Sequence, residues 1–218
     1  MLDYIVVGLG LAGTALCETL RKHNKRFIVY NDSSQNASLV AGGLSNPVIL
    51  KRFTLAWNAT TLIPIANAFY HELEDTLGKK LITDLTVYRR FASVEEQNMW
   101  FEASDKQELK DYLSPELVRN NNKAVIASHD FGKVLHSRRL DTVSTLNRYR
   151  DFLKEEGVLV SDSFDYANLE PYYDHVTYGS VTAKHIVFTE GFGMRGNPFF
   201  NYLPMQGSKG EYLIIKCP

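Results

Sequence analysis

The sequence is poor in cysteine and has no excess of charge of either sign. Cys17 and Cys217 are its two cysteines, and neither belongs to a Cys-x-x-Cys pair or to a Cys/His cluster. This distribution predicts neither a disulfide framework nor a metal site. The formal net charge of −1 lacks the basic surplus that is typical of nucleic-acid-binding proteins, so we expect no nucleic-acid partner.

Long apolar runs are also missing. No stretch approaches the roughly 20 uncharged residues of a membrane-spanning helix. The N-terminal residues 1–3 carry no positive charge, and glycines soon interrupt the apolar run that follows, unlike in a signal peptide. Apolar residues make up 44% and charged residues 22%, a balance typical of soluble globular domains. We therefore expect a soluble, cytoplasmic protein with no membrane partner.

A strand, a glycine-rich loop, a helix and a second strand are present at the start of the chain. Residues 2–7 form a continuous apolar run, which is typical of a buried strand in a parallel sheet. Residues 11–22 repeat apolar side chains at helical spacing, and residues 26–30 are β-branched and aromatic. Strands and helices that alternate at both ends of the chain predict an α/β fold.

Further elements are predicted along the rest of the chain, beyond an irregular stretch over residues 33–55. We expect helices over 61–77, 94–101, 108–113 and 139–156. A hairpin is predicted over 125–135, with residues 130–133 at its turn. We expect strands over 81–91, 158–160, 176–178, 185–188 and 210–215.

The motif Gly8-x-Gly10-x-x-Gly13 lies between the first predicted strand and the first predicted helix. In this context Gly8 permits a tight turn, Gly10 lets the backbone approach a pyrophosphate, and Gly13 lets the helix pack closely on the strand. The helix begins at Leu11, and its N-terminal residues, Leu11 and Ala12, present free N–H groups and partial positive charge to the phosphates. The motif therefore predicts a dinucleotide site.

An acidic residue follows the second predicted strand at a suitable distance. Asp32 lies 19 residues after Gly13 (32 − 13), where a carboxylate can accept hydrogen bonds from ribose hydroxyls. The same carboxylate would repel a 2′-phosphate, which disfavours NADP. An Asx turn at the start of the loop is the alternative interpretation of Asp32. These residues leave both FAD and NAD open.

The next segment resembles the FAD-dependent oxidoreductase family of D-amino acid oxidase, glycine oxidase and sarcosine oxidase. Ser38, Ala41, Gly42 and Gly43 match that family's Ser-x-x-Ala-Gly-Gly segment, which runs past the phosphates towards the flavin, and Leu44 would continue towards the ring. Three later stretches also resemble the family. They are residues 132–160, residues 183–191 and residues 203–211.

The resemblance implies a set of residues in contact with FAD. Phe164 would lie near the adenine through its backbone. Residues 183–191 resemble the family's Ala-Thr-Gly strand end, with Glu190 inserted between Thr189 and Gly191. The implied FAD contacts are Gly8, Gly10, Leu11, Ala12, Gly13, Asn31, Asp32, Ser38, Ala41, Gly42, Gly43, Leu44, Phe164, Thr189, Glu190 and Gly191.

The resemblance also implies a domain organisation and an activity. The fold would be a Rossmann-like FAD/NAD(P)-binding fold over 1–80 and 132–195, with an inserted, partial α+β substrate domain over 81–131 and 196–218. The activity would be oxidation of an amine or amino acid C–N bond by hydride transfer to flavin N5, with Arg52, Tyr88 and Arg90 as candidate substrate-binding residues. Because this chemistry needs little acid/base machinery, we assign no catalytic residue.

Two other functions stay open, and so does the extent of the protein. One is an NAD-dependent oxidoreductase built on the same glycine loop. The other is a nucleotide-binding module without catalysis. Because members of the family are typically much longer, we expect this sequence to be the N-terminal portion of a longer oxidoreductase. The basic cluster His136, Arg138 and Arg139 is interpreted as the solvated start of the 139–156 helix.

Overall fold

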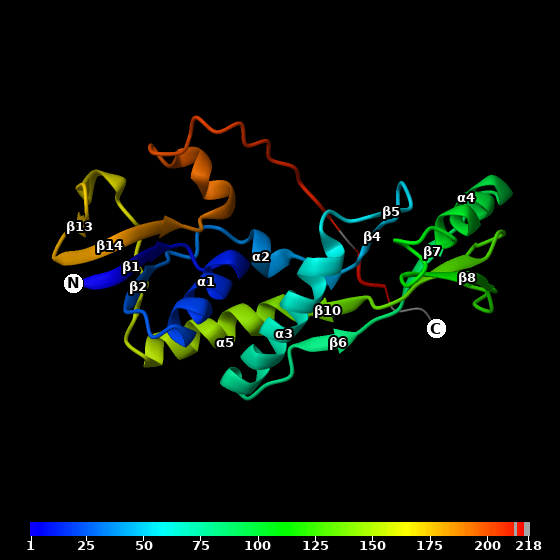
Figure 1. The fold of residues 1–218 in the computed structure, drawn as a ribbon, viewed down its shortest axis with the longest axis horizontal. Coiled ribbons are helices and arrows are strands. Elements are labelled where there is room, and N and C mark those ends of the chain that lie inside the picture. The colour runs from blue at the N-terminus through cyan, green and yellow to red at the C-terminus, as the bar shows by residue number, and fades with distance from the viewer. Residues whose placement is uncertain (212, 216–218) are drawn as a thin grey trace. The chain divides into compact units, whose positions relative to one another are not determined.

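The computed structural model describes residues 1–211 and 213–215, which form two compact units (Figure 1). The first unit contains Met1–Ala41, Asp75–Lys79 and Asp141–Glu211. The second contains Gly42–Glu74, Lys80–Leu140 and residues 213–215. Together they give a mixed α/β fold with a core of parallel strands. Within the described residues, no helix combines the length and apolar character needed to cross a membrane.

A six-stranded sheet forms the centre of the first unit. Its strand order is β11 (Leu159–Val160), β2 (Phe27–Tyr30), β1 (Leu2–Val7), β14 (Val181–Phe188), β13 (Val176–Tyr178) and β12 (Leu169–Pro171). The first four strands are parallel, whereas β13 pairs antiparallel with β14, and β12 pairs antiparallel with β13. Ile5 and Val6, on opposite faces of β1, are completely buried, as the apolar run predicts for a strand covered on both sides.

Helices α1 (Leu11–Lys22) and α5 (Thr142–Glu155) also belong to the first unit, with a short helix α2 (Ala37–Val40). The prediction for residues 11–22 is confirmed. A buried carboxylate joins the two longer helices: Glu18 accepts hydrogen bonds from Arg21 on α1 and from the Tyr149 hydroxyl on α5. Because Glu18 is fully buried, these partners offset the loss of its hydration.

The second unit contains three small sheets and two helices. Helix α3 (Ala59–Leu77) belongs to it as far as Glu74, and α4 (Val94–Ser104) belongs to it entirely. The sheets are β3 (Leu44–Ser45)–β10 (Arg138–Leu140)–β6 (Ile82–Asp84), β4 (Val48–Ile49)–β5 (Thr54–Leu55) and β7 (Val87–Arg90)–β9 (Phe131–Val134)–β8 (Leu113–Val118). Phe91, Trp100 and Leu113 are completely buried at the centre of its core.

Several predicted elements of the second unit are wrong or incomplete. Residues 108–112 form turns, and Leu113 begins strand β8, so no helix covers 108–113. The expected hairpin over 125–135 is replaced by pairing of β9 with both β7 and β8. The predicted strand over 81–91 is split into β6 and β7, and the stretch 33–55 holds α2 and three short strands.

Two further predictions concern helix α5 and the C-terminal tail. The helix begins at Thr142 rather than at 139, because Arg138 to Leu140 pair in β10. The basic cluster is therefore not a helix start: Arg138 forms an ion pair with Asp84, and the Arg139 Nε donates to the Gly42 carbonyl. In the tail, Tyr212 lies outside the described residues, and residues 210, 211 and 213–215 are not in a strand.

The two compact units divide the chain at other positions than the predicted domains, which stay a prediction. Residues 42–74, 80 and 132–140, which the sequence assigns to the cofactor domain, lie in the second unit. Residues 196–211, which it assigns to the substrate domain, lie in the first. The return of the chain to the main sheet through α5 and β11 agrees with the prediction, since β11 pairs in parallel with β2.

Candidate functional site

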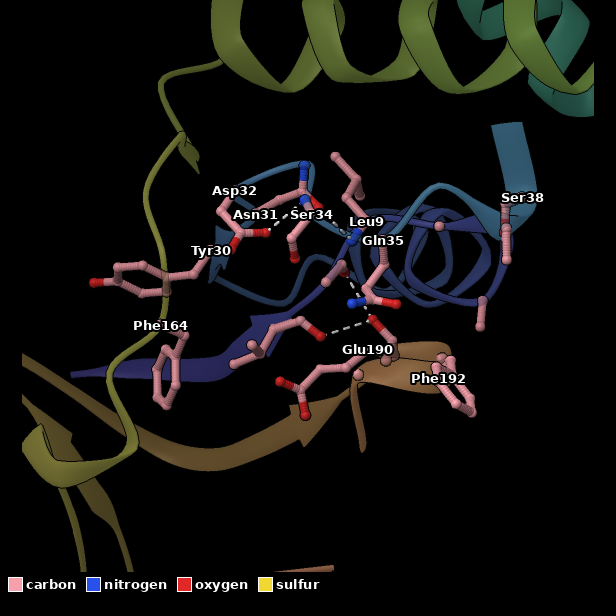
Figure 2. A pocket seen from close by; sticks show the side chains of 18 of the residues that line it. Leu9, Tyr30, Asn31, Asp32, Ser34, Gln35, Ser38, Phe164, Glu190 and Phe192 are labelled. Carbon is pink, nitrogen blue, oxygen red and sulfur yellow. Dashed lines mark hydrogen bonds between the residues drawn. The ribbon is translucent and has the colours of Figure 1, made fainter. Parts of the chain in front are cut away.

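A cavity of about 310 Å³ lies at the carboxyl ends of β1, β2 and β14 in the first unit (Figure 2). Parallel α/β sheets bind ligands at this edge. The walls come from the β1–α1 loop, the end of β2 with the loop after it, the start of α2, the stretch 162–166 and the stretch after β14. All of the lining residues therefore belong to one unit.

Two glycines of the loop fit against β14 without space for a side chain. Gly8 has φ +93°, and a Cβ on it would lie 2.7 Å from the Thr189 carbonyl oxygen. A Cβ on Gly13 would lie 2.4 Å from the Gly8 carbonyl oxygen and 2.8 Å from Thr189 Oγ1. That hydroxyl in turn lies 2.7 Å from the Gly8 oxygen and 3.0 Å from the Val7 oxygen. Thr189 thus fastens the loop to the end of β14.

The N-terminus of α1 opens into the cavity. Gly10 precedes the helix in an extended conformation and offers no side chain to cap it. The Leu11 N–H donates to Ser38 Oγ at 3.3 Å, and a Cβ on Gly10 would lie 3.0 Å from the same hydroxyl oxygen. Ser38, from the segment predicted to pass the phosphates, therefore lies beside the glycine loop. Backbone N–H groups at such a helix end favour an anionic ligand.

Asn31 supports the loop from the neighbouring strand. Its Oδ1 accepts a hydrogen bond from the Leu9 N–H at 3.1 Å, and its own N–H donates to the Val160 carbonyl at 3.0 Å. The side chain thus connects the end of β2 to the glycine loop. Asn31 is one of the cofactor contacts that the sequence resemblance implies, and in the structure it also supports the loop.

Asp32 lies at the other end of the cavity and is largely exposed. Its Oδ1 accepts from the Ser34 N–H at 2.9 Å, which is the Asx turn of the alternative interpretation, and its Oδ2 accepts from Ser163 Oγ at 2.9 Å. The hydrogen bond from the Ser34 backbone is the main cause that lowers the pKa of Asp32, so the carboxylate is ionised at neutral pH. An ionised carboxylate can still accept further hydrogen bonds.

Aromatic rings form the wall next to Asp32. Phe164 stacks on Tyr178, with ring centroids 4.1 Å apart and planes inclined by 17°, and packs edge-on against Tyr30. Within the described residues, the backbone N–H and carbonyl of Phe164 have no hydrogen-bond partner. Both groups are therefore free for a ligand at the position where the sequence analysis expected backbone contacts to adenine.

Glu190 makes contacts that the sequence analysis did not foresee. The Tyr166 hydroxyl donates to Glu190 Oε1, and Asn197 Nδ2 donates to Oε2 at 2.8 Å. Tyr166 lines the cavity, whereas Asn197 is completely buried. Burial, followed by the hydrogen bond to Glu190, raises the pKa of Tyr166, so its phenol stays protonated and remains a donor.

Several lining residues were missed by sequence reasoning. They lie close in sequence to the predicted contacts, and this closeness is the one feature of the sequence that could have indicated them. The missed residues are Val7, Leu9, Tyr30, Ser34, Gln35, Ala37, Asp162, Tyr166, Phe192 and Gly193.

No protein-family model matches the chain. The fold is similar to several solved structures. L-amino acid deaminase from Proteus vulgaris matches over 90% of this chain and 50% of its own, with 12% identity and a TM-score of 0.64. Glycine oxidase from Bacillus cereus matches over 85% and 56%, with 12% identity and a TM-score of 0.65. Iminodiacetate oxidase from Chelativorans sp. matches over 86% and 55%, with 13% identity and a TM-score of 0.58.

The chain shares the fold of these three enzymes. The resemblance stated from the sequence is thus confirmed at the level of the fold. The chain spans about half the length of the solved structures that it matches.

The remaining candidate FAD-binding residues are divided between the two units. Gly13 and Ala41 belong to the first unit but do not line the cavity. Gly42, Gly43 and Leu44 belong to the second unit, where Gly43 has φ +69° and Leu44 pairs with Arg139. Flavin contacts at Ala41, Gly42, Gly43 and Leu44 stay predictions.

The candidate substrate-binding residues all lie in the second unit, where each side chain is exposed. Tyr88 and Arg90 are two positions apart on β7 and therefore point to the same face of the β7–β9–β8 sheet. Arg52 lies in the connection between β4 and β5. Their part in substrate binding stays a prediction.

Proposed function

We propose that this chain provides the FAD site of an oxidoreductase that acts on amino acids or amines. The observation that carries the proposal is the cavity formed by the N-terminus of α1, the glycine loop and Asp32. Its two ends suit the two polar parts of an ADP group: backbone N–H groups for the pyrophosphate and a carboxylate for the ribose hydroxyls.

The residues present fit this cofactor. Because Gly10 has no side chain, the backbone of the loop stays accessible to a ligand. A side chain at this position would lie too close to the Ser38 hydroxyl. At the far end, Asp32 is ionised and Phe164 offers its free backbone groups beside an aromatic wall. The N–H groups of Leu11 and Ala12 would hold the pyrophosphate, Asp32 the ribose, and Phe164 the adenine.

We further propose a division of labour between the two units. The first unit, with its parallel strands β11, β2, β1 and β14, would be a Rossmann-like FAD-binding domain. The second would be part of a substrate domain inserted into it, with an amine or amino acid as its substrate. A positively charged Arg90 beside Tyr88 on one exposed sheet face suits a substrate carboxylate.

When bound, FAD would supply the acceptor, at N5, for a hydride from the substrate C–H bond next to nitrogen. The chain's own contribution is then orientation. The glycine loop and Asp32 fix the ADP end of the cofactor, and Arg90 with Tyr88 would fix the substrate carboxylate. We assign no proton-transfer residue.

The proposal is tested by calorimetric titration of the purified protein with FAD, NAD and NADP, with flavin absorbance and fluorescence as a second readout for FAD. We expect FAD to bind with the highest affinity, and Asp32→Ala to weaken it by about tenfold through loss of roughly 1.4 kcal/mol of hydrogen bonding. Asp174→Ala is the matched control, because Asp174 is an exposed carboxylate outside the cavity with a hydrogen-bonded neighbour, His175.

The outcomes separate the alternatives. Tight binding of NAD without FAD would support a nicotinamide enzyme and contradict the FAD assignment. Binding of FAD followed by anaerobic bleaching with members of an amino acid and amine panel would support the oxidoreductase. Bound FAD that no substrate bleaches would instead indicate a nucleotide-binding module.

A further inference from the structure

The residue that departs most clearly from the resembled strand end, Glu190, is a carboxylate of the cavity that is held at both oxygens, as Asp32 is. Both of its oxygens accept hydrogen bonds, one from the Tyr166 hydroxyl and one from Asn197 Nδ2 at 2.8 Å. Asn197 is completely buried, and its own Oδ1 accepts from the Phe199 N–H at 2.9 Å. The amide is therefore fixed, and it fixes the carboxylate.

Tyr166 is placed at the end of the cavity that carries Asp32. The Ser163 hydroxyl binds Asp32, Phe164 follows it in the wall, and Tyr166 packs against Phe164 with ring centroids 5.7 Å apart. The charge of Asp32 contributes to the raised pKa of Tyr166, which is a second sign that the two side chains are near one another. The pyrophosphate end lies instead at the N-terminus of α1.

From this arrangement we infer that Glu190 and Asn197 position Tyr166 as part of the binding surface for the adenosine moiety of the cofactor. The inference rests on the proposed function and adds a selectivity element to it. A carboxylate group has about four acceptor positions, of which Tyr166 and Asn197 use two. The remaining ones suit hydrogen-bond donors, such as the ribose hydroxyls and the adenine amino group, and oppose a phosphate.

The same hydrogen bonds would order Tyr166 in advance of adenosine binding. Tyr166 is held by Glu190 before any ligand arrives, so no rotamer freedom of this side chain is lost on binding. Without the carboxylate, the half-buried phenol would adopt several orientations, and the adenosine moiety would have to order it.

The test compares Tyr166→Phe, Glu190→Gln and the double variant by calorimetric titration with ADP and with inorganic pyrophosphate. We expect each single variant to weaken ADP binding by about three- to tenfold, with pyrophosphate binding unchanged. The double variant should resemble the single ones, because the two side chains act through one hydrogen bond. Tyr172→Phe is the matched control, since Tyr172 donates to Glu170 at 2.8 Å on the β12–β13 hairpin outside the cavity.

A purely structural cluster would give a different result. Equal losses of ADP and pyrophosphate binding, strictly additive losses in the double variant, or unchanged ADP affinity in both single variants would each overturn the inference. If FAD binds to the wild type while these variants behave in that way, the inference fails and the proposed function stands. A wild-type protein that binds neither FAD nor ADP would overturn both.

Discussion

At the scale of single residues, Gly13 has the tightest surroundings of the phosphate loop. The position of a Cβ there is 2.4 Å from the Gly8 carbonyl oxygen and 2.8 Å from Thr189 Oγ1. Neither neighbour can yield easily, because one is backbone and the other is hydrogen bonded to it. The absence of a side chain at Gly13 therefore sets how closely α1 approaches the end of β14.

Gly13→Ala should separate these elements and disturb the loop between them. We expect a loss of about 1–3 kcal/mol in the free energy of unfolding, as for other overpacked cores, together with weakened FAD binding. Urea denaturation and FAD titration would measure both. Gly196→Ala is the control: apart from its chain neighbours, no described residue has an atom within 4 Å of its Cβ position, so the change should stay within about 0.5 kcal/mol. Equal effects of the two substitutions would contradict this explanation.

The same residues show what a sequence can reveal about a site. The glycines were predictable because the Gly-x-Gly-x-x-Gly spacing is complete within six consecutive residues, although Gly8 and Gly13 also lie against Thr189. The bonds of Asn31 to Leu9 and of Glu190 to Tyr166 join segments 22 and 24 residues apart. Such contacts depend on which strands become neighbours, and a pattern of adjacent residues carries no record of that.

At the scale of elements, the predicted ranges of helices and strands are correct where the spacing of apolar residues favours a single structure. Strand β1 and helix α1 match their predicted ranges because apolar spacing, burial and local propensity agree there. The prediction failed at Gly132, which was interpreted as a turn residue. Gly132 lies within β9, where a Cβ would come 2.5 Å from the Trp100 ring and 2.6 Å from the Phe91 ring. The glycine serves close packing, which the sequence pattern could not distinguish from a turn.

Three strands of the main sheet are connected near their starts by Asp3. Its Oδ1 accepts from Lys184 Nζ on β14 at 2.8 Å, and its Oδ2 accepts from the Arg26 N–H just before β2 at 3.0 Å. The hydrogen bond from Lys184 is the main cause that lowers the pKa of Asp3 to about 2, from an ordinary value of 3.8. A carboxyl group with a lower pKa in the folded state stabilises that state only while it is ionised.

The contribution of Asp3 should therefore be complete above about pH 4 and should disappear as the pH falls through about 2. Asp3→Asn is expected to lower the urea midpoint at pH 5, and the difference from the wild type should shrink steadily towards pH 2. Lys184→Met should reproduce most of this change and show little further effect in combination with Asp3→Asn. A difference between Asp3→Asn and wild type that is the same at both pH values would contradict the assignment.

At the scale of the whole molecule, the two units have separate buried cores. One core contains Ile5, Val7, Tyr30, Leu169, Val176 and Ala183, and the other contains Val48, Phe53, Phe91, Trp100, Ala103, Leu109, Leu113 and Val134. Both tryptophans, Trp57 and Trp100, belong to the second unit. The cavity proposed for the ADP group is lined by the first unit alone. A ligand confined to that cavity should therefore act on one core.

This separation predicts where ADP will stabilise the protein. At a concentration of 100 times its dissociation constant, a ligand that binds only the folded state adds about 2.7 kcal/mol to the free energy of opening. Hydrogen exchange should accordingly slow over residues 5–12, 27–35 and 183–193, while residues 87–104 and 113–134 keep their rates. The Asp32→Ala variant at the same ADP concentration is the control, because its lower occupancy should reduce the protection. If the second set of residues slowed as much as the first, the two cores would open together, and the cavity could not be treated as a property of the first unit alone.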